Sequence, residues 1–275
     1  MKSTSIFQPG RPRALGERGE RIPLDPTIPA LLPPEEKRRH RKQRLAASFR
    51  IFAHFGFDEA AAGYIMARDP IRTDCFWVNP FGMSFKQIRV RDLCLVDFDG
   101  NVVHGTWSVS HSASNIFTYI KDTRPEVVCV AHGHTMYSKA FASLHRHLRP
   151  LTQDACIFFE DHGLCIDEGH GVANNSDEGK RIAEAIGPYK AAIVADHGIF
   201  TVGQSVDEAV FWYVSLEHSC QAELIAMAAG DPKPIPEHVA RKLRGQIGFP
   251  LAGWYSAQPM FEWILAEQPD CLEEE

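Results

Sequence analysis

The sequence has no long hydrophobic run, and this absence narrows the class of protein. No apolar stretch approaches the roughly 18 residues that a membrane-spanning helix requires. The first residues, M-K-S-T-S-I-F-Q-P-G-R-P-R, also lack the apolar core of a secretory signal peptide. The seven cysteines are scattered singly and include no C-x-x-C pair, which favours reduced thiols over a disulfide framework. We therefore expect a cytoplasmic protein with no membrane partner.

A concentrated positive charge is also missing from most of the chain. The formal net charge is −6, and the isoelectric point is about 6.1. The one basic run, Lys37–Arg44, fits the solvated face of a helix better than a surface for an acidic partner. Without a wider basic surface, nucleic acid is not an expected partner, and we expect a small-molecule substrate instead.

Length and composition indicate one domain with two tails. The chain has 275 residues, of which 44% are hydrophobic, and this is enough for one sizeable core. Residues 1–34 are rich in Pro, Gly and Arg without any period, which predicts an extended arm. Residues 35–230 form the predicted domain. Residues 231–275 are rich in aromatic side chains, and we expect this tail to pack on the domain or on a neighbouring subunit.

Periodic apolar residues and capping signals predict the main helices of this domain. One helix follows Pro34 and ends at Gly56. Further helices are predicted over residues 136–148, 176–186 and 206–229. Residues 76–85 are predicted to form a strand followed by an Asn-Pro and Gly turn, and residues 88–97 a helical turn and a strand that lead into the Asp99-Gly100 turn.

Two apolar strands each end at a histidine followed by glycine. The run Val127–Val130 leads to His132, Gly133 and His134, and residues i and i+2 of an extended chain point to the same side. His197 follows a second apolar run and also precedes a glycine. Three neutral imidazoles with an open position would make a catalytic mononuclear metal site. Spacing alone leaves open a plainer interpretation, in which these histidines are polar residues at strand ends.

Four sequence blocks, in this order, resemble the class II aldolase/adducin family. They are R-P-E-V-V-C-V-A-H-G-H-T, L-T-Q-D-A, E-G-K-R-I-A-E-A-I-G and A-D-H-G-I-F-T-V-G-Q-S-V-D-E-A, and the resemblance covers about Arg44 to Gly230. It implies an α/β fold of three layers, with a central, mainly antiparallel sheet and helices on both faces. It also implies a homotetramer, and one divalent metal ion, Zn²⁺ or Fe²⁺, held by His132, His134 and His197.

The segment that binds the substrate phosphate in the sugar-phosphate aldolases departs from the family pattern here. Gly63 and Arg68 match it, but Tyr64 and Met66 stand where those aldolases have Asn and Ser. A phenol and a thioether cannot offer the same phosphate contacts, which argues against a phosphorylated sugar. Tyr64 could instead line a site for an apolar or aromatic substrate, or it could be a half-buried packing residue. Arg68 is retained as a predicted substrate-binding residue.

The acid/base position of the aldolases is also changed. Ala113 stands where the family carries a catalytic glutamate, and Phe117 stands where histidine is common. An alanine cannot transfer a proton. His111, or failing it His104, is the candidate replacement, with a surface histidine as the alternative for each. Phe117 is predicted to contact the substrate.

Other polar residues near the expected site are weaker candidates. Glu160 is predicted to bind substrate, and with Asp161 and His162 it would stand at the mouth of the site unless this segment is a solvated loop. Glu217 or His218 could also reach the metal. His145 and His147 are not expected to be ligands, because side chains two apart on a helix diverge.

Three classes of function follow from these features. The favoured one is a metal-dependent enzyme that cleaves a C–C bond of an unphosphorylated, aromatic 2-oxo or 2-hydroxy acid by decarboxylation. With iron the reaction would be oxidative, as in the non-heme iron oxygenases of aminocoumarin antibiotic biosynthesis, a part of secondary metabolism. The alternatives are a zinc-dependent aldolase, which is a retro-aldol lyase, and a non-catalytic module like adducin.

Overall fold

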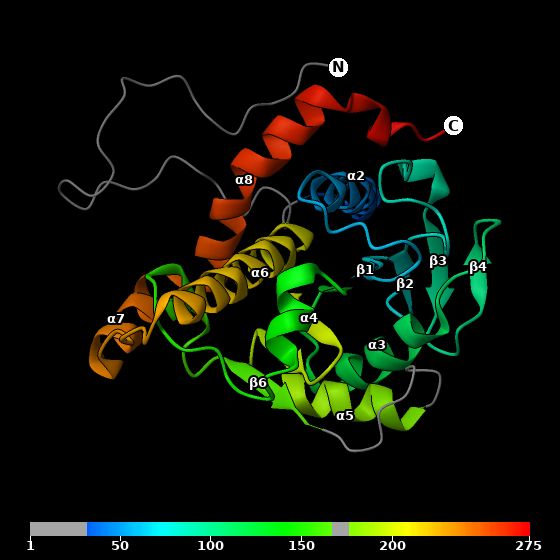
Figure 1. Ribbon diagram of the computed structural model, residues 1–275. Helices are drawn as coiled ribbons and strands as arrows, with labels where there is room; N and C mark the ends of the chain where they lie inside the picture. The colour runs from blue at the N-terminus through cyan, green and yellow to red at the C-terminus, as the bar shows by residue number, and fades with distance from the viewer. Residues whose placement is uncertain (1–31, 167–175) are drawn as a thin grey trace.

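The computed structural model describes residues 32–166 and 176–275 (Figure 1). The predicted arm, residues 1–34, lies outside the described residues except for its last three. The α-helices are Pro34–His54 (α2), His111–Thr123 (α3), Met136–Ala142 (α4), Ser176–Ile186 (α5), Val206–Ala229 (α6), Glu237–Ile247 (α7) and Pro250–Glu267 (α8). The β-strands are Tyr64–Arg68 (β1), Cys75–Val78 (β2), Cys94–Asp97 (β3), Val102–His104 (β4), Cys129–Gly133 (β5), His162–Cys165 (β6), Ala191–Val194 (β7) and Gly198–Gly203 (β8). Short 3₁₀ turns are Val90–Asp92, Asp154–Phe158 and Pro269–Leu272.

The strands form one eight-stranded sheet in the order β4-β3-β2-β1-β5-β8-β7-β6. Neighbouring strands are antiparallel, except for β6 and β7, which are parallel. The chain between β6 and β7 contains α5, the crossover that a parallel pair requires. In the middle of the sheet, Tyr64 of β1 lies opposite His132 of β5, which lies opposite Phe200 of β8.

Helices cover both faces of the sheet. Side chains alternate along β5, so that Ala131 packs into one core and Val130 into the other. The first face is covered by α2, α4, α6 and α8, and the second by α3 and α5, which lie side by side (Figure 1). The predicted fold class, a three-layer α/β fold with a mainly antiparallel sheet, is therefore confirmed.

The C-terminal residues form two helices, α7 and α8, that were not predicted from the sequence. Helix α8 packs against α6 and α2, and its side chains Ala257, Phe261 and Ile264 are buried in the same core as those helices. Gly253 permits this approach, because a Cβ atom there would lie 2.5 Å from the indole ring of Trp212. The first core is thus completed from the C-terminal end of the chain.

The helix expected over residues 136–148 is shorter than predicted. Helix α4 ends at Ala142, and His145 has a left-handed φ of 50°. The following arginines, Arg146 and Arg149, reach the buried carboxylate of Glu223 on α6 and hold this segment against the core. The helix-based reason for excluding the nearby histidines as ligands is therefore wrong.

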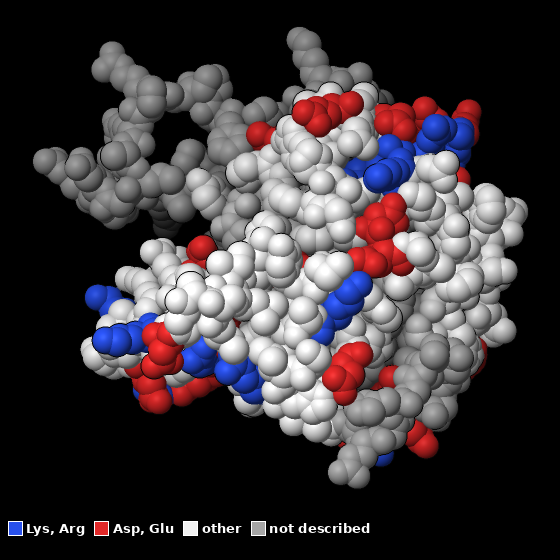
Figure 2. Space-filling model, in the orientation of Figure 1, with Lys and Arg blue, Asp and Glu red and all other residues white. Residues whose placement is uncertain are grey.

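The surface is mixed in charge. On the face shown in Figure 2, Lys and Arg are interspersed with Asp and Glu, and no continuous basic area is visible. In residues 32–166 and 176–275, no helix combines the length and the apolar character that a membrane crossing would need.

Candidate metal centre

Strand β5 carries His132, and His134 follows directly after the last residue of the strand, Gly133. His132 is almost fully buried, and its side chain points to the face covered by α3 and α5. Phe200 of β8 stacks flat on its ring, with centroids 3.9 Å apart and planes 2° from parallel. The Nδ1 atom of His132 lies 3.0 Å from the carbonyl oxygen of Ile199. A carbonyl can only accept a hydrogen bond, so Nδ1 carries the proton and donates, and Nε2 keeps its lone pair.

The third histidine lies in the turn of the hairpin formed by β7 and β8. Ala195, Asp196 and His197 connect these strands, and Asp196 adopts a left-handed φ of 56°, which aspartate tolerates better than most residues. Since β8 is hydrogen-bonded to β5, the turn brings His197 to the end of the strand that bears His132 and His134. Residues more than 60 apart in sequence meet in this way.

The glycines beside the histidines are required by close packing. A Cβ atom at Gly133 would lie 2.8 Å from the hydroxyl oxygen of Tyr213 on α6. A Cβ atom at Gly198 would lie 2.7 Å from the carbonyl oxygen of Gly133. Contacts this short require something to move, so the two His-Gly pairs reflect the tight approach of β5, β8 and α6.

The three imidazoles converge on one point. The Nε2 atoms of His134 and His197 are 2.9 Å apart, and one nitrogen from each of the three rings falls within a 4.8 Å cluster. Nitrogens that share an ion at about 2.1 Å in tetrahedral geometry are about 3.4 Å apart, close to this arrangement. The described residues therefore fit a single divalent cation, and a donor set of imidazoles suits Zn²⁺ and Fe²⁺ alike.

The protein environment keeps these rings neutral, which is the form that binds metal. Burial lowers the pKa of His132 well below its usual value, and the other two histidines lower it further. Burial also lowers the pKa of His197 to about 4, helped by His134. For His134 the causes of a lowered pKa are burial and then Lys139. No proton has to leave before a cation can bind at neutral pH.

The chain after His134 is fixed by Glu217, which was one candidate for reaching the metal. Its buried carboxylate accepts hydrogen bonds from the backbone N–H groups of Tyr137 and Ser138 at 2.9 and 2.7 Å, and from the Thr135 hydroxyl at 2.6 Å. Glu217 thus caps α4, where a negative charge is favourable. It positions the segment next to His134 and is not one of the three clustered residues.

The other candidate on α6, His218, lies elsewhere. Its exposed ring contacts the rings of Phe55 and Phe57. Of the two histidines after α4, His145 bonds to Asp196 and His147 lies beside His162. His162 has a separate structural role, because its Nε2 accepts the N–H of Leu148 and its Nδ1 donates to the carbonyl of Phe158.

Tyr64 is the predicted substrate residue that the structure brings to the histidines. Its ring centroid lies 5.1 Å from that of His132, and only 4% of the residue is exposed. Burial raises the pKa of Tyr64, partly offset by a hydrogen bond with Ser112 of α3. Tyr64 therefore stays protonated at neutral pH and is a buried residue that packs beside the three histidines.

Arg68 and Phe117 lie farther along β1 and α3. Arg68 is four residues from Tyr64, about 13 Å along an extended strand. Its guanidinium reaches the carbonyl of Lys121 and lies 5.7 Å from the ring of Phe117. Phe117 is fully buried between Phe76 and Phe98, one turn after the buried Ala113. The structure therefore does not bring Arg68 to the three histidines, and it places Phe117 in the core.

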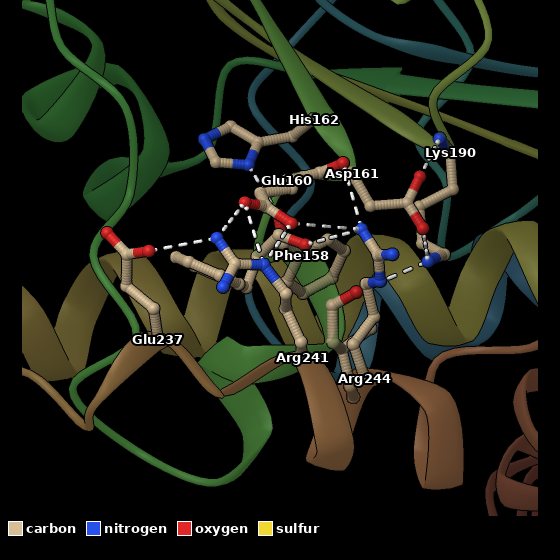
Figure 3. A network of polar contacts seen from close by, with 10 residues as sticks. Phe158, Glu160, Asp161, His162, Lys190, Glu237, Arg241 and Arg244 are labelled. Atoms are coloured by element: carbon tan, nitrogen blue, oxygen red, sulfur yellow. Dashed lines mark hydrogen bonds and ion pairs between the residues drawn. The ribbon is translucent and has the colours of Figure 1, made fainter. Parts of the chain in front are cut away.

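The remaining candidates are not among the three clustered residues. His111, the first residue of α3, is exposed beside the Gly100 turn, and His104 of β4 faces the ring of Trp77. Glu160 binds Arg241 of α7 through several contacts of 2.7–3.1 Å, and Arg244 donates to its carbonyl oxygen (Figure 3).

Further contacts in Figure 3 join this part of the chain to the sheet. Asp161 pairs with Lys190 just before β7 (Figure 3). Together these contacts tie the start of β6 to α7 and to the sheet. They give Glu160 a structural partner, Arg241.

One residue near the centre was not singled out from the sequence. Glu178, in the first turn of α5, has a carboxylate oxygen 4.0 Å from Nδ1 of His197. The sequence marked it only as part of an acidic helix start.

Comparison with known proteins identifies the family of the chain. Residues 43–224 match the model of the class II aldolase and adducin N-terminal domain. The chain belongs to the class II aldolase/adducin family. The predicted resemblance is thereby confirmed, and it extends over most of the described sheet and its helices.

Relatives within this family carry different activities in their names. The decarboxylase NovR of Streptomyces niveus is 43% identical over 237 residues, 86% of this chain and 87% of its own length. The 4-hydroxy-3-prenylphenylpyruvate oxygenase/4-hydroxy-3-prenylbenzoate synthase of Streptomyces roseochromogenus subsp. oscitans is equally similar, covering 86% and 85%. A solved structure described as L-fuculose 1-phosphate aldolase, from Glaciozyma antarctica PI12, has a TM-score of 0.82 at 39% identity, covering 88% and 95%.

Proposed function

We propose that this protein is a mononuclear metal enzyme that decarboxylates an unphosphorylated, aromatic 2-oxo or 2-hydroxy acid. With Fe²⁺ bound and dioxygen as oxidant, the decarboxylation is oxidative. The observation that carries the proposal is the position of Tyr64, whose buried ring lies 5.1 Å from that of His132 where sugar-phosphate aldolases bind phosphate through polar side chains. The names of the two relatives at 43% identity, a decarboxylase and an aromatic 2-oxo acid oxygenase, support the same class of reaction.

The chain's own residues define what such a site would do. A divalent metal held by His132, His134 and His197 supplies a Lewis acid, and as iron also a redox centre. Tyr64 presents an aromatic face and a protonated hydroxyl, so it can pack against an aromatic substrate and donate a hydrogen bond to an oxygen. Phe200 stacks on His132 and keeps water from that side of the ring.

The chain has no acid/base residue at the position where the aldolases carry their catalytic glutamate. Ala113 is a buried methyl group in the core beneath α3 and cannot act as acid or base. Decarboxylation of a 2-oxo acid starts by C–C cleavage and needs no proton abstraction first. A reaction of this class therefore tolerates the loss of the glutamate, whereas an aldolase that depends on it does not.

A zinc-dependent aldolase remains the second candidate, since a 39% identical structure is described as one. A sugar phosphate would require polar contacts where this chain has Tyr64 and Met66, and both of these side chains are buried. The two candidates differ in metal, in oxygen requirement and in substrate, so one panel of assays separates them.

The test begins with the metal content of protein purified without added cations. Protein reconstituted with Fe²⁺ or Zn²⁺ is then incubated with phenylpyruvate, 4-hydroxyphenylpyruvate, 4-hydroxy-3-prenylphenylpyruvate and fuculose 1-phosphate, in air and without oxygen. We expect release of CO₂ from aromatic 2-oxo acids and oxygen uptake with Fe²⁺. Introducing Ala113→Glu should not raise this activity. Oxygen-independent cleavage of fuculose 1-phosphate would refute the proposal in favour of the aldolase.

We also propose that the chain assembles as a homotetramer, as the family resemblance implies. Met136 and Tyr137 support this, because both are exposed at the start of α4, directly after the ligand His134 and Thr135. Subunit contact there would place each metal centre near an interface. Static light scattering at micromolar concentration should give about four times the mass of one chain, and a monomer would refute the assembly.

A further inference from the structure

We propose that Glu178 is a positioning residue that accepts the Nδ1–H of His197 and so turns Nε2 of this ring toward the metal. The inference rests on the proposed three-histidine site and adds a residue to it. His197 already has this orientation, because Nε2 faces His134 at 2.9 Å while Nδ1 faces the Glu178 carboxylate at 4.0 Å. The two nitrogens of one imidazole thus point to the metal site and to a carboxylate.

The carboxylate belongs to the surroundings of the metal centre and is not one of its ligands. The cluster of donor atoms within 4.8 Å contains the three histidines, and Glu178 is not a member. A 4.0 Å separation is longer than a hydrogen bond by about 1 Å, a distance that a small rotation of the glutamate side chain can close. The side chains of His197 and Glu178 are only 20% and 12% exposed, so a hydrogen bond between them is well shielded from water.

Packing of α5 on α3 explains why a carboxylate reaches this point. A Cβ atom at Gly179 would lie 3.0 Å from the backbone carbon of Asn115, so the glycine lets the two helices approach closely. Glu178, the preceding residue, is carried toward the metal end of the sheet. Its negative charge also acts on the hydroxyl of Tyr64, which places the carboxylate within electrostatic reach of both sides of the centre. The first turn of a helix is a favourable place for this charge.

We expect the hydrogen bond to Glu178 to fix the ring of His197 in place and to make its Nε2 a stronger ligand. A histidine ligand normally donates its second N–H to a carboxylate, a carbonyl or a water, and this partner fixes the tautomer and the ring orientation. His132 has such a partner in the carbonyl of Ile199. Glu178 would provide the equivalent for His197, with a full negative charge in place of a neutral carbonyl.

The test measures metal binding and needs no substrate. Wild type, Glu178→Gln, Glu178→Asp and the matched control Glu184→Gln, an exposed residue of the same helix, are titrated with Co²⁺ against a chelator. We expect Glu178→Gln to weaken Co²⁺ binding by roughly 10- to 100-fold and to alter the visible Co²⁺ spectrum. Glu178→Asp should recover part of the affinity, and Glu184→Gln should match wild type. Thermal unfolding of the metal-free proteins verifies that each variant is folded.

The results distinguish a failure of the role of Glu178 from a failure of the three-histidine site. If wild type binds Co²⁺ more tightly than His197→Ala, but Glu178→Gln keeps the wild-type affinity and spectrum, the role of Glu178 is refuted and the site stands. If His197→Ala binds Co²⁺ as wild type does, both the site and the role of Glu178 are refuted.

Discussion

His197 is the histidine on which a residue-level test of the metal centre is best made. It is less buried than His132 and lies in a turn, so its removal should disturb the sheet less than the removal of His132 would. We predict that His197→Ala loses most of its bound metal and its activity, because two imidazoles hold a divalent cation much more weakly than three. Metal analysis after dialysis measures the effect.

His238→Ala is a suitable control for that experiment, since this exposed histidine lies on α7 and outside the cluster. It should retain the wild-type metal content. Full metal occupancy in the purified His197→Ala protein would overturn the ligand assignment.

A second residue-level prediction concerns Gly133, the glycine between His132 and His134. Gly133→Ala places a methyl group 2.8 Å from the hydroxyl of Tyr213, in a core where neither can move freely. We expect a loss of about 1–3 kcal/mol in the free energy of unfolding. Tyr213→Phe removes the hydroxyl oxygen, and combining the two changes should cost less than the sum of the single ones.

This double-mutant cycle has a definite contrary result. If the two changes have additive effects on the free energy of unfolding in urea, the close contact has no role. Tyr213→Phe alone also loses a 3.2 Å hydrogen bond with Thr135, so its own effect has to be measured separately.

The clustering of the three histidines could be anticipated from the sequence, because these residues lie on the strands or directly beside them. His132 and His134 follow from the two-residue period of β5, and His197 from a second strand-like run. Glu178 could not be found in this way, because its place depends on how α5 packs on α3. The substrate-binding role of Arg68 stays a prediction: the residue matches a family motif, and the extended strand carries it about 13 Å from Tyr64.

At the level of elements, the histidine that begins β6 predicts a dependence of stability on pH. Burial lowers the pKa of His162 to about 4, opposed by the hydrogen bond to the carbonyl of Phe158. In the unfolded chain this pKa is about 6.5, so between these values the unfolded state binds more protons. Stability is therefore lost as the pH falls from about 6.5 toward 4, by about 2 kcal/mol at pH 5 from this residue.

His162→Asn provides the measurement for that prediction. Asparagine keeps a donor for the carbonyl of Phe158 but cannot titrate. We expect the metal-free variant to be less stable than wild type at pH 7.5, yet to lose about 2 kcal/mol less between pH 7.5 and pH 5 in urea unfolding. Parallel pH profiles for the two proteins would show that His162 does not cause the dependence.

A helix could be predicted from the sequence where its own residues carry clear start, stop and spacing signals. Helices α2, α5 and α6 have clear starts, clear ends or a regular apolar spacing, and the predicted bounds of α5 and α6 match the observed ones. Helix α4 was overestimated, because its termination depends on salt bridges to Glu223, 74 or more residues away. Helix α8 was missed, because Pro259 lies inside it and its buried side chains are recognisable only against α2 and α6.

At the scale of the whole molecule, α8 packs the C-terminal residues against the helices that cover the sheet. Arg44 of α2, Asp207 of α6 and Gln258 of α8 form one buried hydrogen-bonded group. The guanidinium of Arg44 also lies 3.7 Å from the ring of Phe261. The family match ends at residue 224, before α7 begins, yet the core continues into α8. We therefore propose that the described chain unfolds as one unit.

Phe261→Ala tests this proposal. Phe261 is fully buried in the core shared by α2, α6 and α8, so its truncation should cost about 3–5 kcal/mol. If α8 belongs to one cooperative unit, tryptophan fluorescence and circular dichroism should report a single urea transition that moves as a whole to lower urea. Glu262→Ala, exposed on the same helix, should leave the free energy of unfolding within about 0.5 kcal/mol of the wild-type value. A variant in which fluorescence changes early while the circular dichroism transition stays at the wild-type midpoint would show that α8 is a separable tail.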